Sequence, residues 1–297
     1  LSNFKNKYRV LGITPELIGK LAIKKGINTL LRYFDNSAVT HILKHYGKAR
    51  LVTATNVFAH IDNVETVIKN ILKILDKDGV FISESHYLVS LIQTVQYDTI
   101  YHEHFSYLTL HAAQTIFNQA GLKIWNVEEV ETHGGSLRIY GCHQEDVRTI
   151  DLAVSRVLFN EARIGLQTTA GYEMLQNNAN KLKNEFLEFL ITQKRKGKLV
   201  VGYGAAAKGN TLINYAGVKH DLIRCVLDGA EAKQGMYLPG SHIPVVDPKH
   251  YDWSTVDSVI IFPWNISDEI VTLIRNKFSS KARLYIFVPK FQELGVD

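Results

Sequence analysis

The sequence has little of what marks several common protein classes. Only two of its 297 residues are cysteine, Cys142 and Cys225, so a disulfide framework and a cysteine-based zinc site are both excluded by count. No run of about 18 apolar residues occurs, and no basic segment leads into an apolar one at the N-terminus. The composition therefore predicts a soluble, cytoplasmic protein with no membrane partner.

A strong excess of one charge is also missing. Lys and Arg number 34 against 29 Asp and Glu, and the net charge of +5 is spread along the chain. The densest cationic cluster, residues 194–198, precedes an apolar run, as expected for a solvated helix end followed by a turn. Nucleic acid is therefore not an expected partner.

The first half of the chain alternates short apolar runs with amphipathic segments, which is typical of a mostly parallel sheet flanked by helices. Helical spacing covers 15–24 and 64–75, and Asp62 or Asn63 is the expected cap of the second helix. Residues 76–79 predict a turn. The expected strands are 8–13, 50–54, 79–83, 123–129 and 137–142.

The second half begins with a long helical pattern. Residues 151–196 carry apolar side chains at helical spacing, which predicts one or two long helices that bridge two domains. A second alternating unit follows from Lys198, with a strand, a glycine turn and a helix in succession. Further strands are expected at 222–227, 258–262 and 284–288. The fold class is therefore α/β, with two α/β units in a chain long enough to bury two cores.

The densest group of proton-handling side chains lies in residues 97–107, with three tyrosines, two histidines and two carboxylates. Aromatic rings favour burial whereas unpaired charges resist it, and a cleft reconciles the two demands. A histidine beside a carboxylate suits a general base, and a tyrosine hydroxyl can donate to a developing oxyanion. A buried, hydrogen-bonded hairpin explains the cluster equally well. A metal site of His102 and His104 with His86 or His133 is weakly supported, because no third ligand is fixed.

Two glycine-containing segments are further candidates. Residues 132–138 place a histidine and two glycines before an apolar strand, which favours a ligand-facing loop over a plain turn. Residues 202–210 form a strand, loop and helix that can present backbone N–H groups to an anion, and Asp228 downstream is placed to meet a ribose hydroxyl. The third glycine, Gly209, falls later than the dinucleotide pattern requires, so the signal for a nucleotide is moderate and that for NAD is weak.

Five stretches together resemble the family of deoxysugar C-methyltransferases, and they follow that family's order over most of the chain. They are TNVFAHIDN at 55–63, DTIYHEH at 98–104, HGGSLR at 133–138, GYGAAAKGN at 202–210 and KQGMYLPG at 233–240.

The resemblance implies a zinc-binding module, a class I methyltransferase domain and a C-terminal Rossmann-like domain. On this basis residues 1–145 are the methyltransferase domain without its first strand and glycine loop, 146–197 are a helical bridge, and 198–297 are the Rossmann-like domain. Because the chain begins with Leu1 and not methionine, we expect a fragment, a processed form or a trimmed chain. Zinc is expected only in the module that is missing here, and no metal ligand is assigned.

The resemblance also implies an activity, the transfer of a methyl group from S-adenosylmethionine to a sugar carbon next to a keto group, through a base-generated enolate. The substrate would be a nucleotide-diphosphate deoxysugar. His104 would be the base, with Glu103 and Tyr101 positioning it or the sugar. Thr14 stands where the family has an acidic residue for the cofactor ribose, and Asn56 and His60 would line the same pocket. The residues implied to bind the substrate are His133, Gly134, Ser136, Arg138, Tyr203, Gly204, Ala206, Lys208 and Asn210.

Two other functions remain open from the sequence. The chain could be a non-catalytic protein that binds a nucleotide sugar and lacks a complete cofactor site. It could also be an NAD-dependent oxidoreductase built on the Gly202 loop, against which the glycine spacing argues.

Overall fold

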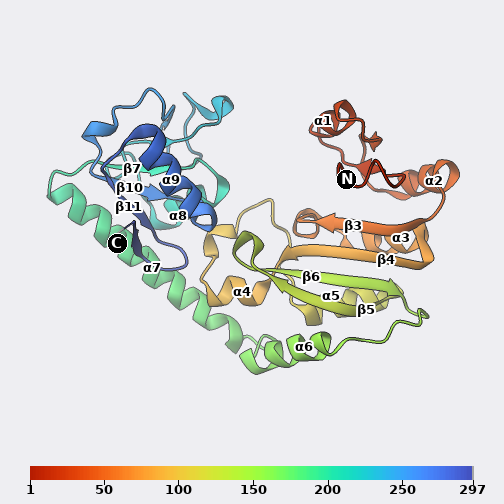
Figure 1. Ribbon diagram of the computed structural model, residues 1–297. Coiled ribbons are helices and arrows are strands. Elements are labelled where there is room, and N and C mark those ends of the chain that lie inside the picture. The colour runs from red at the N-terminus through yellow and green to blue at the C-terminus, as the bar shows by residue number, and fades with distance from the viewer. Residues whose placement is uncertain (296–297) are drawn as a thin grey trace. The chain divides into compact units, whose positions relative to one another are not determined.

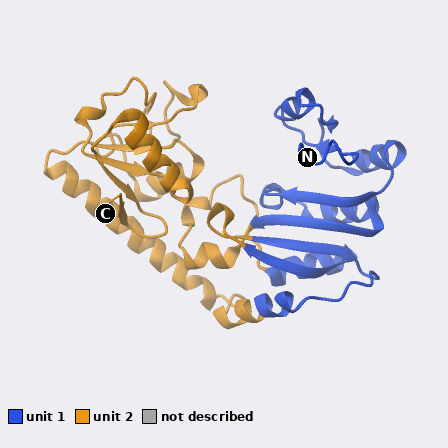
Figure 2. Ribbon diagram, in the orientation of Figure 1, with its two compact units in different colours: residues 1–85, 110–129, 137–158 blue, residues 86–109, 130–136, 159–297 orange. Residues whose placement is uncertain are grey.

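The computed structural model describes residues 1–295, which divide into two compact units that are interleaved along the sequence (Figure 2). Unit 1 contains residues 1–85, 110–129 and 137–158, and unit 2 contains residues 86–109, 130–136 and those from 159 onward. The predicted domains are consecutive ranges, whereas the segments with the histidines at 102, 104 and 133 lie in unit 2. The assignment of these ranges as domains stays a prediction.

Unit 1 is built on two small sheets. A four-stranded sheet has the order β3-β4-β6-β5, and β1 and β2 form a separate parallel pair. Helices α3 and α5 pack side by side, and both lie behind the four-stranded sheet in Figure 1. The elements that begin in unit 1 are β1 (Gly12–Ile13), α1 (Gly19–Lys24), β2 (Thr29–Leu30), α2 (Asn36–His45), β3 (Ala49–Thr55), η1 (Phe58–His60), α3 (Val64–Ile74), β4 (Leu75–His86), α5 (Leu110–Gln119), β5 (Leu122–Val130) and α6 (Leu152–Ile164).

The core of unit 1 explains why these segments fold as they do. The aromatic ring of Phe81 on β4 lies between Phe58 and Phe117, with ring centroids 5.8 and 5.7 Å apart. Gly141 on β6 (Ser136–His143) leaves room for the Phe117 ring, since a Cβ there would lie 3.1 Å from it. Alternate side chains of the strands therefore pack into one apolar layer between the sheet and helices α3 and α5.

Unit 2 is built on a six-stranded sheet with the order β12-β11-β10-β7-β8-β9. All neighbours are parallel except β11 and β12, and the order reverses between β7 and β10. The elements of unit 2 are α4 (Leu88–Gln93), η2 (Tyr97–Thr99), η3 (Thr132–Gly134), α7 (Ala170–Arg195), β7 (Val200–Tyr203), α8 (Ala207–Ala216), β8 (Val226–Leu227), η4 (Glu231–Lys233), β9 (Val245–Val246), η5 (Trp253–Thr255), β10 (Ser258–Ile261), η6 (Trp264–Ile266), α9 (Ser267–Phe278), β11 (Arg283–Ile286) and β12 (Gln292–Leu294).

The long helix α7 confirms the predicted helical stripe. Leu182, Phe186 and Leu190 are buried in the core of unit 2, and Phe189 packs against that core. The Phe186 ring meets Phe287, which follows β11, with centroids 4.7 Å apart. The stripe is therefore core packing, as its spacing indicates.

Several predicted boundaries are wrong, each for a local reason. The strand expected from Tyr8 contains only Gly12–Ile13, because Tyr8 lies in a bend, is 65% exposed, and is followed by irregular backbone up to residue 11. Helix α1 begins at Gly19 and not at Pro15, since residues 15–18 turn before it. The turn expected at 76–79 is part of β4, where the pairing with β3 moves from Ala49–Leu75 to Leu51–Val80.

Other differences are shorter strands and three helices that the pattern did not indicate, α2, α4 and α5. Of the strand expected at 222–227 only Val226–Leu227 forms, because the Leu222 and Ile223 amides both donate to the Lys219 carbonyl. Helix α2, which was not predicted, is capped by Asp35, whose carboxylate accepts the Ala38 N–H at 2.7 Å.

Candidate functional site

The carboxyl ends of β7 and β10 mark the place in unit 2 where a ligand is expected. In open parallel sheets, ligands bind outside the carboxyl ends of strands where the strand order reverses. Here β7 pairs with β8 on one side and with β10 on the other. The predicted glycine loop, residues 204–206, follows β7 and leads into α8 at this point.

The glycine loop is held by side chains of the same unit. Gly204 has a φ of +92°, and a Cβ there would lie 2.5 Å from the Pro263 ring. Asp228, after β8, accepts the Ala205 N–H at 2.8 Å, and its other oxygen accepts the Ala230 N–H at 2.8 Å. The Lys233 ammonium donates to the Ala205 carbonyl at 2.8 Å. Asp228 therefore anchors the loop, and the expectation that it meets a ribose hydroxyl is not supported by these contacts.

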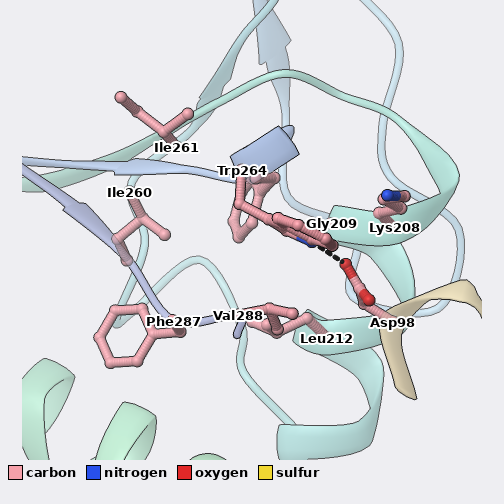
Figure 3. A pocket seen from close by; sticks show the side chains of 10 residues that line it. Asp98, Lys208, Gly209, Leu212, Ile260, Ile261, Trp264, Phe287 and Val288 are labelled. Carbon is pink, nitrogen blue, oxygen red and sulfur yellow. Dashed lines mark hydrogen bonds between the residues drawn. The ribbon is translucent and has the colours of Figure 1, made fainter. Parts of the chain in front are cut away.

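A small cavity of about 10 Å³, partly open to solvent, lies where α8 begins (Figure 3). Asp98 of η2 is 1% exposed, and its Oδ2 accepts a hydrogen bond from Trp264 Nε1 at 2.7 Å. Its Oδ1 is buried and has no hydrogen-bond partner among residues 1–295. The cavity is lined by Asp98, Lys208, Gly209, Leu212, Ile260, Ile261, Phe262, Trp264, Phe287 and Val288.

Burial shifts the pKa values of both charged groups at this cavity. Burial raises the pKa of the Asp98 carboxyl, and the Lys208 charge and the Trp264 hydrogen bond oppose that rise. Burial likewise lowers the pKa of the Lys208 ammonium, which the charge of Asp98 opposes. The Lys208 Nζ lies 4.5 Å from the centroid of the Trp264 ring and 3.2 Å from Asn265 Oδ1.

The predicted base, His104, lies in a group of aromatic rings within unit 2. Its Nδ1 is 2.8 Å from the Thr99 carbonyl oxygen. Because a carbonyl only accepts, Nδ1 carries the hydrogen, and Nε2 holds the lone pair of the neutral ring. The Tyr101 ring is 4.2 Å from the His104 ring, and the His86 ring is 5.6 Å away. The ring is partly exposed, so this arrangement can accept a proton at Nε2.

Tyr101 and Glu103 differ in their surroundings. Burial, followed by the charges of Glu103 and Asp98, raises the pKa of Tyr101, so its hydroxyl is protonated at neutral pH and can donate. Glu103 is exposed. His133 extends the group of rings, since its ring is 5.7 Å from that of His86.

The segment from His133 to Arg138 is shaped by close packing in unit 2. Gly134 has a φ of +88°, and a Cβ there would lie 2.4 Å from the Trp264 ring. Ser136 is buried and donates to the Thr132 carbonyl at 3.0 Å. These contacts account for the glycine and the serine by packing, and a ligand-facing role for His133, Gly134 and Ser136 stays a prediction.

The remaining predicted residues make contacts of other kinds. Arg138 belongs to unit 1, where its guanidinium donates to Glu84 at 2.8 and 2.9 Å and to Glu128 at 3.0 Å. Tyr203 on β7 is 8% exposed and packs in an apolar core. The Asn210 Oδ1 on α8 is buried without a hydrogen-bond partner among the described residues.

The three residues predicted to bind the cofactor lie in unit 1. Asn56 follows β3 with a φ of +53°, and its N–H donates to the Glu84 carbonyl at 2.7 Å. The Asn56 Oδ1 is buried with no hydrogen-bond partner within residues 1–295. Thr14 follows β1 and its hydroxyl accepts the Glu16 N–H at 3.2 Å, while His60 ends η1. Asn56 thus offers a buried acceptor at the carboxyl end of a parallel strand.

Sequence reasoning missed Trp264 and gave Asp98 no role of its own. Asp98 was counted in the proton-handling cluster, but only the folded chain brings it to Trp264. One signal could have found Trp264, since it follows an apolar strand of the second unit by three residues, at an edge where ligands are expected.

Neither a metal-binding cluster nor a membrane-crossing helix is present in the part of the chain that the structure describes. No group of three or more His, Cys, Asp or Glu side chains among residues 1–295 is arranged to hold a metal ion. Over the same residues, no helix is long and apolar enough to cross a membrane.

Two family models match the chain. Residues 131–289 match the C-terminal domain of C-methyltransferases, and residues 4–127 match a methyltransferase domain. Among curated proteins, the C-methyltransferase NovU of Streptomyces niveus is 31% identical over 290 residues, which cover 97% of this chain and 69% of NovU.

Solved structures resemble parts of the chain more distantly. A SAM-dependent methyltransferase from Anabaena variabilis is 14% identical, with 48% of this chain and 71% of that chain covered and a TM-score of 0.40. A pericyclic reaction enzyme is 10% identical with a TM-score of 0.36, and the match covers 48% of this chain and only 38% of that enzyme.

Proposed function

Since this chain belongs to the family of S-adenosylmethionine-dependent class I C-methyltransferases, we propose that it methylates a sugar carbon next to the keto group of a nucleotide-linked deoxysugar. The observation that carries the proposal is the 2.8 Å contact between His104 Nδ1 and the Thr99 carbonyl oxygen. The His104 Nδ1–H donates to the Thr99 carbonyl, so Nε2 is the basic nitrogen. A ketone whose neighbouring carbon must lose a proton is the substrate that such a base suits.

The proposed chemistry begins with a proton that leaves the carbon next to the keto group. The Nε2 of His104 takes that proton, and the electron pair moves onto the keto oxygen to form an enolate. The Tyr101 hydroxyl, held protonated by burial, donates a hydrogen bond to this oxygen. Glu103 would position His104 or the sugar, the role that the resemblance implies for it.

The cofactor site in unit 1 fits a donor-rich ligand. The buried Oδ1 of Asn56 has no hydrogen-bond partner among the described residues, and an amino group or ribose hydroxyl of S-adenosylmethionine would satisfy it. His60 and the Thr14 hydroxyl would hold the same molecule. When bound, S-adenosylmethionine supplies the electrophilic methyl group that the enolate carbon takes.

The diphosphate of the sugar nucleotide is assigned to the N-terminal end of α8. Ala206 and Gly204 lead into this helix, and Lys208 stands in its first turn. A helix N-terminus and a nearby ammonium both favour a phosphate group. The buried Oδ1 of Asn210 on the same helix only accepts, so it would suit a hydroxyl of the sugar nucleotide and not its phosphates, whereas the core packing of Tyr203 favours a supporting role for its ring.

The test is turnover of nucleotide-linked keto-deoxysugars by the full-length protein with S-adenosylmethionine. We expect His104→Ala to lower kcat by about 10²- to 10⁴-fold, because it removes the general base. His102→Ala is the matched control, since His102 is the exposed histidine two residues away, and we expect its kcat to stay within about twofold. A His104→Ala variant as active as the parent would refute the assignment of the base. Sugar-nucleotide binding without turnover in the parent would instead support the non-catalytic alternative.

A further inference from the structure

Trp264 contacts three segments of unit 2 that carry proposed site residues. Its indole N–H donates to Asp98, and its ring lies under the Lys208 ammonium (Figure 3). The ring also packs on Gly134 so closely that a Cβ there would lie 2.4 Å from Cη2. One side chain thus joins the base-bearing segment, the His133 loop and the first turn of α8.

A short chain of bonds leads from Trp264 to the proposed base. Asp98 precedes Thr99, whose carbonyl accepts hydrogen bonds from His104 Nδ1 at 2.8 Å and from the Tyr107 hydroxyl at 2.9 Å. The Thr99 hydroxyl in turn donates to the Gln96 carbonyl at 2.8 Å. A shift of Asp98 therefore moves the acceptor that sets the tautomer of His104.

The position of Asp98 depends on Trp264 because the carboxylate is almost wholly buried. Its exposed fraction is 1%, and one of its oxygens already lacks a hydrogen-bond partner among residues 1–295. A buried carboxylate that loses its hydrogen bond from a side-chain donor carries a larger desolvation penalty. Without the indole N–H, η2 would move to expose Asp98, and Thr99 would move with it.

We propose that Trp264 is a positioning residue for the methyl transfer, acting through Asp98 and the Thr99 carbonyl to hold His104 in the tautomer whose Nε2 is basic. This inference rests on the proposed function for its catalytic meaning, but the tautomer itself can be observed without any substrate.

The first experiment is nitrogen NMR of the full-length protein labelled at histidine, in the parent and in Trp264→Phe. Phenylalanine keeps an aromatic ring at position 264 but removes the N–H donor together with part of the indole, so a tryptophan control that loses the same atoms is needed. Ring nitrogen shifts distinguish a hydrogen on Nδ1 from one on Nε2, and His104→Gln identifies the His104 signals. We expect the parent to show the Nδ1–H form of His104 and Trp264→Phe to show a mixture of tautomers. An unchanged Nδ1–H signal in folded Trp264→Phe would overturn the proposal.

The matched control is Trp253→Phe, which also removes a buried indole N–H in unit 2. Trp253 donates to the Pro248 carbonyl at 2.8 Å, remote in sequence from the base-bearing segment. We expect this variant to keep the parent's His104 signals. If both variants alter His104 equally, the effect is general loosening of unit 2, and the proposal fails.

The second experiment compares kcat with KM, below the melting temperature of every variant. We expect Trp264→Phe to lower kcat roughly 10- to 100-fold with the KM for the sugar nucleotide within about threefold, because the base and not the binding site is disturbed. The double variant Asp98→Ala/Trp264→Phe should have a kcat no lower than that of the slower single variant, because both substitutions remove the same hydrogen bond between Trp264 and Asp98. A raised KM at unchanged kcat would make Trp264 a binding residue and overturn the proposal. A parent without turnover would refute the proposed function alone, because the NMR experiment still decides the positioning role.

Discussion

At the scale of single residues, some glycines of unit 2 are required by the side chains that lie against them. Gly202 on β7 has no unusual backbone angle, yet a Cβ there would lie 2.5 Å from the Phe262 ring and 3.0 Å from Val226. The sequence pattern assigned Gly202 to a nucleotide loop, whereas the contacts show that it makes room for a core side chain.

We expect Gly202→Ala to destabilise the protein by about 1–3 kcal/mol, because the added methyl group overpacks the core beside Phe262. Gly229→Ala is the control, since nothing lies within 4 Å of a Cβ at Gly229. Urea denaturation of both variants measures the difference. Equal stability of the two variants would contradict this prediction, because it would show that the Phe262 ring can move aside without lowering the free energy of unfolding.

At the scale of elements, local sequence signals predicted whether a segment is a helix or a strand better than they predicted its first and last residues. Helix α3 begins where the sequence expected it, and of the two candidate caps the structure selects Asn63, whose Oδ1 accepts the Thr66 N–H at 2.9 Å. The strands predicted at 8–13 and 222–227 were too long. A run of apolar residues does not show which backbone N–H and C=O groups form hydrogen bonds to a neighbouring strand.

Loss of the cap should therefore weaken α3. Asn63→Ala is expected to lower the free energy of unfolding by about 1 kcal/mol, since one helix N–H loses its acceptor. Asn63→Asp keeps an acceptor and should stay close to the parent, and Asp62→Ala should have little effect. Thermal and urea unfolding check this order, which would be contradicted if Asp62→Ala were the more harmful change.

At the scale of the whole molecule, the buried carboxyl of Asp98 links stability to pH. Burial raises its pKa above the ordinary value of 3.8, against the opposing effects of Lys208 and Trp264. Below pH 3.8 the folded and unfolded chains both hold the proton. As the pH rises from there through the folded pKa, the unfolded chain ionises first, so stability falls.

We therefore expect the parent to gain stability relative to Asp98→Asn as the pH is lowered from 7 toward 4, because only the parent carries this carboxyl. The pKa of Lys208 is lowered from an ordinary value of 10.5, so its own contribution changes on the alkaline side. Urea midpoints at several pH values give the comparison. Parallel curves for the two proteins would mean that Asp98 is ionised in the fold throughout.

The sequence by itself determined the α/β class, the long helical stripe and the ordered motifs that indicate a C-methyltransferase, because these depend on local spacing and residue type. Only the tertiary structure decided that Asp228 anchors the glycine loop, that the Asn56 Oδ1 finds no hydrogen-bond partner within residues 1–295, and that Trp264 holds Asp98 across 166 positions of the chain. The physical reason is that burial and pairing between distant residues follow from how sheets and helices pack, and no local period in the chain encodes them.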